Sequence, residues 1–163
     1  MIRAMRGWLG AVVATMVMVL AVAAPARGNV GSSVADGWNN DNIQWLDYEP
    51  GLKVAKAAGK PVFLVAHTTW CPHCKHYQKL FFDPRIVELA KAYVMVMIDR
   101  DLDTELNKTI GPNGQTFVPR TVVMHADGTV RLDVTGSRRE HPNFIDYRSP
   151  DELIRVMEKG RTQ

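Results

Sequence analysis

The sequence predicts an α/β fold: a single domain with a central mixed sheet flanked by helices. Two apolar runs, "PVFLVAH" at 61–67 and "YVMVMID" at 93–99, lack the polar alternation of a half-exposed strand and indicate strands buried on both faces. The segment between them opens with a Cys-x-x-Cys motif and continues with helical spacing. Parallel strands joined through a helix need a sheet covered on both sides, which is the arrangement of an α/β layer fold.

The elements around these strands follow from local signals. A short helix is expected over 49–58, and Gly59 ends it. The helix after the first long strand begins near Pro72, which suits a first helical turn, and breaks at 83–84. The polar, Gly/Asn-rich stretch 101–116 is expected to be a loop with at most one helical turn.

The last third of the domain is predicted to be a hairpin and a helix. The segment "TVVMHADGTVRLDVTG" at 121–136 indicates two strands joined at its Asp-Gly pair. The final segment has the signature of a capped helix: an N-cap, a proline in the first turn, a capping-box glutamate and a stop, supplied by Ser149, Pro150, Glu152 and Gly160.

The chain divides into a leader and one domain. Residues 1–26 combine two arginines, a short apolar run and a small-residue Ala-Pro-Ala site, which indicates a signal peptide; an uncleaved N-terminal anchor is the rival interpretation. Residues 27–41 are rich in Gly, Ser and Asn and are expected to form a flexible lead-in. The domain is expected to span 42–163.

Net charge argues against nucleic-acid binding. The formal charge of the whole chain is +3, and removal of the leader with its two arginines leaves +1. The remaining sequence has no basic run. We therefore expect no nucleic-acid partner.

The two cysteines of the chain, Cys71 and Cys74, are expected to be reactive. Secreted proteins that depend on disulfides for stability carry several bridges that close long loops. A Cys-x-x-Cys bridge closes a very short ring and constrains the unfolded chain little. Thiol–disulfide exchange is the chemistry that this spacing favours.

The position of the pair assigns each cysteine a role. Cys71 is expected at the N-terminus of the helix that begins at Pro72, where unpaired backbone N–H groups favour a thiolate and make it the attacking sulfur. Cys74, one turn further in, is expected to resolve the mixed disulfide. A protonated His73 between them stabilises the Cys71 thiolate and moves the pair towards the oxidising side.

A metal site is the competing interpretation of "HTTWCPHCKH". Two cysteines, His73 and His76 are possible zinc or copper ligands. Structural zinc sites draw on two separated ligand pairs, and the sequence contains no second Cys/His pair. No metal is therefore expected, and no other cofactor.

From about residue 60 to 159 the chain resembles the thioredoxin superfamily. Within it, "KPVFLVAHTTWCPHCK", "GPNGQTFVPR" and "DGTV" are similar to the small secretory-pathway proteins of the anterior-gradient group, while Cys-Pro-His-Cys and the valine before Pro119 resemble DsbA-type oxidases. The resemblance implies a compact thioredoxin-like fold. It also implies that Val118-Pro119 is a cis peptide facing the cysteines, where Val118, Pro119 and Trp70 help an extended substrate dock.

Two departures from the family pattern affect localisation and proton transfer. The chain ends in "KGRTQ" rather than an endoplasmic-reticulum retention signal, so periplasmic localisation is preferred over secretion. Many thioredoxin-like enzymes hold a buried carboxylate six residues before the first cysteine, paired with a lysine. Here these positions are Val65 and Met95, and His67 is the nearest titratable candidate.

The sequence as a whole predicts an exported thiol–disulfide oxidoreductase that works on the oxidising side. Its expected partners are proteins with cysteines and a redox protein that recycles the pair. One alternative is a periplasmic reductase for a dedicated target, such as apocytochrome or a copper-site assembly protein, supplied by a membrane-bound reductant. The other is a non-catalytic binding, chaperone or metal-binding module.

Overall fold

The computed structural model describes residues 35–111 and 114–162, and the predicted signal peptide lies outside them. The described residues contain four strands, five α-helices and one 3-10 helix. Their order is β1 (Trp45–Leu46), α1 (Tyr48–Ala58), β2 (Val62–His67), α2 (Pro72–Gln78), η1 (Lys79–Phe82), α3 (Pro84–Ala90), β3 (Val94–Asp99), α4 (Thr104–Thr109), β4 (Arg120–Met124) and α5 (Asp151–Arg161). None of these helices is long and apolar enough to cross a membrane.

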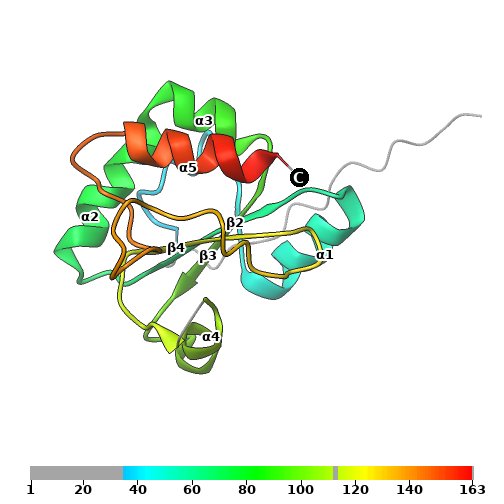
Figure 1. Ribbon diagram of the computed structural model, residues 1–163, viewed down its shortest axis with the longest axis horizontal. Coiled ribbons are helices and arrows are strands. Elements are labelled where there is room, and N and C mark those ends of the chain that lie inside the picture. Colours follow the sequence, from blue (N-terminus) through cyan, green and yellow to red (C-terminus); the bar gives the residue numbers. More distant parts are fainter. Residues whose placement is uncertain (1–34, 112–113, 163) are drawn as a thin grey trace, which may run out of the picture.

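The strands form one mixed sheet in the order β1-β3-β2-β4. β2 pairs with β3 in parallel, from Val62 opposite Val94 to His67 opposite Asp99, and pairs antiparallel with β4 on its other side. In Figure 1, α3 and α5 lie on one side of the sheet, and α1 and α4 lie on the other. The predicted fold class, a helix-flanked mixed sheet in a single domain, is confirmed.

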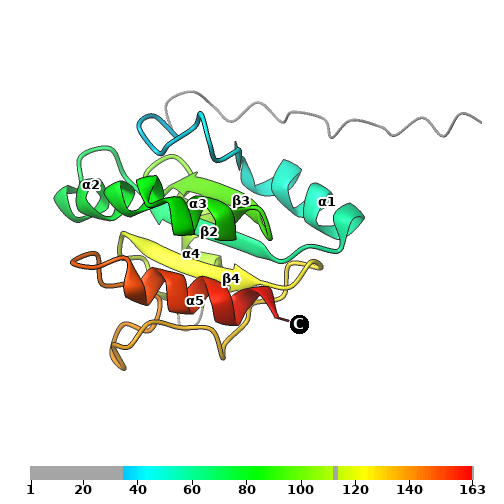
Figure 2. The ribbon, with the colours of Figure 1, turned by 90° about the horizontal axis from the view of Figure 1, so that it is seen from above.

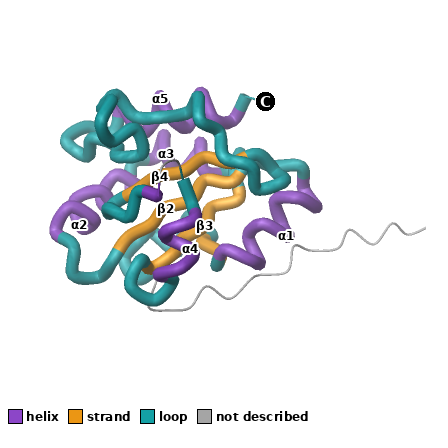
Figure 3. Tube along the Cα trace, turned by 60° about the horizontal axis from the view of Figure 1, so that its bottom comes forward, coloured by secondary structure: helices purple, strands orange, loops and turns teal. Residues whose placement is uncertain are grey.

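Both faces of the sheet are buried, as the apolar runs predicted. Alternate residues of β2 point to opposite sides. Phe63 and Val65 join a core with α2, α3 and α5, whereas Leu64 and Ala66 join a second core with α1 and α4. The strand therefore needs apolar side chains from Val62 to Ala66, and Figure 3 shows helices on both sides of it.

The prediction that residues 27–41 form a flexible lead-in is wrong for the part of this range that the structure describes. Ala35 and Trp38 are buried in the core on the α2 side, and the Trp38 ring meets Trp45 at 5.9 Å and Phe81 at 5.5 Å between centroids. The Asn39 side chain donates a 2.8 Å hydrogen bond to the Phe81 carbonyl. One large aromatic side chain outweighs the Gly/Asn composition around it because its burial removes so much apolar surface from water.

The expected hairpin forms only its turn. β4 is followed by a turn at Asp127-Gly128 and by a single bridge between Met124 and Val130, and the described residues beyond it form no second strand. Gly128 has φ +90°, as this turn requires. The chain then leaves the sheet as a loop that returns to α2. The strand-like pattern after the turn therefore forms no second strand.

The caps of α5 also differ from the prediction. Glu152 does not close a capping box with Ser149; its carboxylate accepts from the backbone N–H groups of Ser137 and Asp146 and so fixes the preceding loop. Gly160 does not stop the helix, which continues to Arg161. In Figure 2, α5 runs beside β4, and Gly160 of this helix packs closely against Val123 of the strand.

Replacing Gly160 by Ala is expected to destabilise the fold, although alanine is the better helix former by about 1 kcal/mol. A Cβ at this position would lie 2.6 Å from the Tyr93 hydroxyl and 3.0 Å from a Val123 methyl group. We expect a net loss of about 1–2 kcal/mol in the free energy of unfolding, measured by urea denaturation. Glu158→Ala, on the exposed surface of the same helix, is the control and should change it by less than about 0.5 kcal/mol. A more stable Gly160→Ala variant would contradict this packing.

Candidate functional site

The two cysteines lie side by side at the start of α2. β2 ends at His67, a three-residue turn follows, and Cys71 is the N-cap residue, with Pro72 in the first helical turn as predicted. The backbone N–H of Cys74 donates to the Cys71 sulfur at 3.3 Å. Both cysteines are free thiols and are buried, with 4% of Cys71 and 2% of Cys74 exposed.

The environment of the pair is asymmetric. The Cys71 sulfur receives a backbone N–H, and such a donor stabilises negative charge on it. Burial raises the pKa of the Cys74 thiol to about 12, with a smaller contribution from its hydrogen bond to Cys71. Cys74 is therefore held as a neutral thiol, while the Cys71 sulfur has a donor that would stabilise a thiolate; the attacking and resolving roles stay predictions.

The Val118-Pro119 segment faces the cysteines from the other side. The peptide bond is cis, which confirms the expected isomer. The Cys71 thiol donates to the Val118 carbonyl oxygen at 3.8 Å, a contact between residues 47 apart in the chain. The fold thus brings together the predicted nucleophile and the predicted docking segment.

His73 turns towards a residue that the sequence did not single out. Its Nδ1 lies 2.6 Å from the hydroxyl oxygen of Tyr147, and the ring of His76 stacks on Tyr147 at 5.6 Å between centroids and 14° between planes. The loop before α5 is thereby fixed to α2. No local pattern links Tyr147 to a motif 74 residues earlier, so only the folded chain reveals this contact. The tuning role of His73 stays a prediction.

Trp70 lies beside Cys71 with 60% of its surface exposed. Its indole N–H donates to Asp101 at 2.7 Å, and the Arg100 guanidinium lies over the ring, 5.0 Å from its centroid. The indole hydrogen bond, followed by that of Arg100, lowers the pKa of the Asp101 carboxyl. The ring is held in place and open to solvent, as a docking residue would be.

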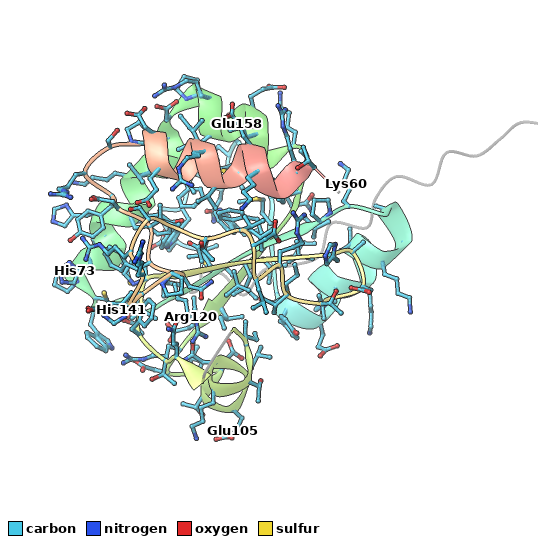
Figure 4. The ribbon with its side chains drawn as sticks, viewed as in Figure 1. Lys60, His73, Glu105, Arg120, His141 and Glu158 are labelled. Atoms are coloured by element: carbon cyan, nitrogen blue, oxygen red, sulfur yellow. The ribbon has the colours of Figure 1, made fainter. Side chains whose placement is uncertain are left out.

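Arg120, directly after the cis proline, is a second residue that sequence reasoning missed. It is fully buried, and its Nη2 donates to both the backbone and the side-chain oxygen of Asn107, each at 2.7 Å. Burial lowers the pKa of the guanidinium to about 10. In Figure 4, Arg120 lies between the strands and α4. It fastens the start of β4, and with it the Val118-Pro119 segment, to α4.

On the opposite side of the sheet, a buried hydrogen bond supports α2. The hydroxyl groups of Tyr77 and Thr121 lie 2.6 Å apart, and the Thr121 backbone N–H donates to Asn143 at 2.8 Å. β4 therefore holds both halves of the site: its first residue supports the docking segment, and its second supports the helix with the cysteines.

Within 35–111 and 114–162, no three His, Cys, Asp or Glu residues are grouped as a metal site would require. The two histidines of the competing metal interpretation, His73 and His76, both contact Tyr147.

Comparisons with known proteins agree with this geometry. Residues 43–126 match a family model described as thioredoxin-like. The chain is 31% identical to anterior gradient protein 2-B of Xenopus laevis over 143 residues, which cover 86% of this chain and 84% of that protein. It is 27% identical to human anterior gradient protein 3, over 86% of this chain and 84% of that protein.

Two solved structures have the same fold. A disulphide isomerase from Xylella fastidiosa superimposes with a TM-score of 0.56 and 26% identity, over 68% of this chain and 86% of that chain. A thioredoxin from Thermus thermophilus superimposes with a TM-score of 0.54 and 19% identity, over 72% and 86%. With its fold, its paired cysteines and its identity to the anterior gradient proteins, this chain belongs to the thioredoxin-like family and is a relative of the anterior gradient proteins.

Proposed function

We propose that this protein is an exported thiol–disulfide oxidoreductase that acts on cysteine-containing proteins. The observation that carries the proposal is the asymmetry of the pair: Cys71 receives a backbone N–H on its sulfur, while Cys74 is kept as a buried thiol. The similarity to the Xylella fastidiosa disulphide isomerase supports it.

The reaction proceeds through a mixed disulfide. In the reducing direction, the Cys71 thiolate attacks a substrate disulfide, one S–S bond breaks, and one substrate sulfur leaves as a thiol. Cys74 then attacks the Cys71 sulfur, forms the Cys71–Cys74 disulfide and releases the second substrate thiol. In the oxidising direction the same steps run backwards, and a separate redox protein restores the disulfide.

Substrate docks across the exposed side of the pair. An extended segment placed against Val118 and Pro119 presents its sulfur to Cys71, and Trp70 supplies an apolar surface next to it. His73 is the residue that favours the oxidising direction, because a positive charge near Cys71 stabilises its thiolate. Export rests on the leader at 1–26, with the periplasm preferred over secretion.

Substitution of each cysteine separates the two roles. Cys71→Ser should abolish insulin reduction, with a loss of about 100-fold or more, since no other thiolate is available to attack. Cys74→Ser should instead accumulate mixed disulfides with substrate, visible on non-reducing gels, because nothing resolves them. Full activity of the Cys71→Ser protein would rule out the proposed function.

Alkylation at about pH 8 should modify only one cysteine of the reduced protein. A thiol with a pKa of about 12 is thiolate in roughly one molecule in ten thousand at that pH, and only the thiolate reacts. Brief treatment with iodoacetamide should therefore label Cys71 and leave Cys74 free, as read by peptide mass spectrometry. The Cys71→Ser protein, in which only Cys74 remains, should stay unlabelled. Equal labelling of both sites would contradict the asymmetry of the pair.

The reduction potential of the pair tests the direction. We expect a value above about −180 mV in glutathione buffers, towards the oxidising end of the thioredoxin-fold range. His73→Ala should lower it by about 30 mV or more by removing the charge near Cys71. Tyr147→Phe, which keeps the ring beside His73 but removes its hydroxyl, shows whether that hydrogen bond positions the imidazole. A potential near −270 mV, about that of thioredoxin, would indicate a reductase instead.

A further inference from the structure

Cys74 needs a proton acceptor, and the core behind it supplies none of the usual kind. A thiol must lose its proton before it attacks, and this one is buried in the core below α2. Val65 and Met95, the positions where many thioredoxin-like enzymes carry an acid and a lysine, are apolar and belong to the same core. The acceptor has to come from elsewhere on the walls around Cys74.

A pocket of about 400 Å³ with a mixed polar and apolar lining opens on Cys74. It has room for several water molecules, and the polar side chains in its walls can hydrogen-bond to them. The lining residues come from the N-terminal segment, the end of β2 and α2: Asp36, Trp38, His67, Thr68, Thr69, Cys74, Lys75 and Gln78. Three of them other than Cys74 titrate: Asp36, His67 and Lys75.

His67 is the best placed of these three. It is the last residue of β2, on the same face as Val65, and its ring packs edge-on against Trp38 with centroids 5.2 Å apart. Only 3% of it is exposed, whereas Asp36 and Lys75 are on the surface. Histidine is also the side chain that gains and loses a proton near neutral pH, while lysine is already protonated there.

Charged groups of both signs surround His67. Asp99 is its register partner in β3 and is itself buried, so a carboxylate lies on the neighbouring strand. One Asp99 oxygen accepts from the backbone N–H of Asp101. The Arg100 backbone N–H donates to the His67 carbonyl, which ties the two strand ends together. Asp99 and Asp36 stabilise an imidazolium, while Lys75 and Arg100 oppose it.

We infer that His67 accepts the proton of Cys74, through water in this pocket, when Cys74 resolves a mixed disulfide. This step rests on the proposed function. The Cys74 S–H bond breaks, its proton passes to the His67 imidazole, and the sulfur electrons form the bond to Cys71 sulfur. The substrate sulfur leaves with the electrons of the broken S–S bond. In the reverse direction, His67 returns the proton to Cys74.

The test is the pH dependence of the resolving step alone. Reduced protein is mixed with oxidised glutathione, which forms the Cys71 mixed disulfide and releases one molecule of glutathione thiol, and the disappearance of the mixed disulfide is followed by acid quench and mass spectrometry. In the wild-type protein the rate should rise from about pH 5 and level off near neutrality, once the imidazole is unprotonated. In His67→Gln it should fall at least about tenfold at pH 7 and rise about tenfold per pH unit, because only hydroxide remains as base.

Matched variants separate this role from a structural one. His125→Gln, an exposed histidine after β4, should keep the wild-type profile. Asp99→Asn keeps an oxygen acceptor for Asp101 but removes the charge, so the levelling point should move to lower pH. Asp99→Asn therefore tests the inference even if His67→Gln fails to fold. The urea midpoint of His67→Gln shows whether it has folded.

Two failures are distinguishable. A wild-type profile in folded His67→Gln, or an unchanged levelling point in Asp99→Asn, would overturn the role of His67 and leave the oxidoreductase intact. If oxidised glutathione forms no mixed disulfide on Cys71 in the Cys74→Ser protein, where nothing resolves it, the proposed function itself is wrong.

Discussion

The rest of the structure depends on the complete burial of β2. This strand pairs on both edges and packs on both faces, so neither its register nor its direction can shift without exposing apolar surface to water. Its last residue is His67, and Cys71 follows four positions later at the start of α2. The location of the Cys71 sulfur is therefore set by the packing of an apolar strand.

β4 meets this strand with polar residues at its own beginning. Arg120 and Thr121 point to opposite faces, one to Asn107 and the other to Tyr77. A buried guanidinium is costly to remove from water, and the two Asn107 oxygens offset part of that cost. The sheet thus places the Val118-Pro119 segment and the cysteine helix through two hydrogen-bonded anchors, in addition to apolar contact.

The parts that sequence predicted are those with a local cause. Continuous apolar runs identified β2 and β3, and Pro72 identified the start of α2. The spacing from Cys74 to Pro119 gave the cis peptide only through the family resemblance, since nothing local distinguishes the isomers. Trp38 was missed because a single aromatic residue in a Gly/Asn-rich stretch has no periodicity.

Contacts between residues far apart in the chain could not be predicted, for the same reason. Tyr147 and Arg120 gain their importance from partners in other elements, and composition carries no trace of such pairs. The hairpin prediction shows the opposite error, because it expected a strand that does not form. Val130 lies in a strand-like pattern but makes only one bridge, to Met124 of β4. Pattern alone cannot tell a residue that pairs from one that merely could.

The buried Trp38 has a consequence for how the cysteine pair is insulated. Trp38 lies against His67 and lines the pocket beside Cys74. The N-terminal segment therefore forms one wall of that pocket. A chain shortened to residue 42, where composition would place the domain boundary, would lose that wall and admit bulk water to the inner sulfur. Water there would lower the desolvation that keeps Cys74 neutral. The N-terminal edge of this domain thus contributes both to the core and to the burial of Cys74, and trimming it would change the packing and the chemistry together.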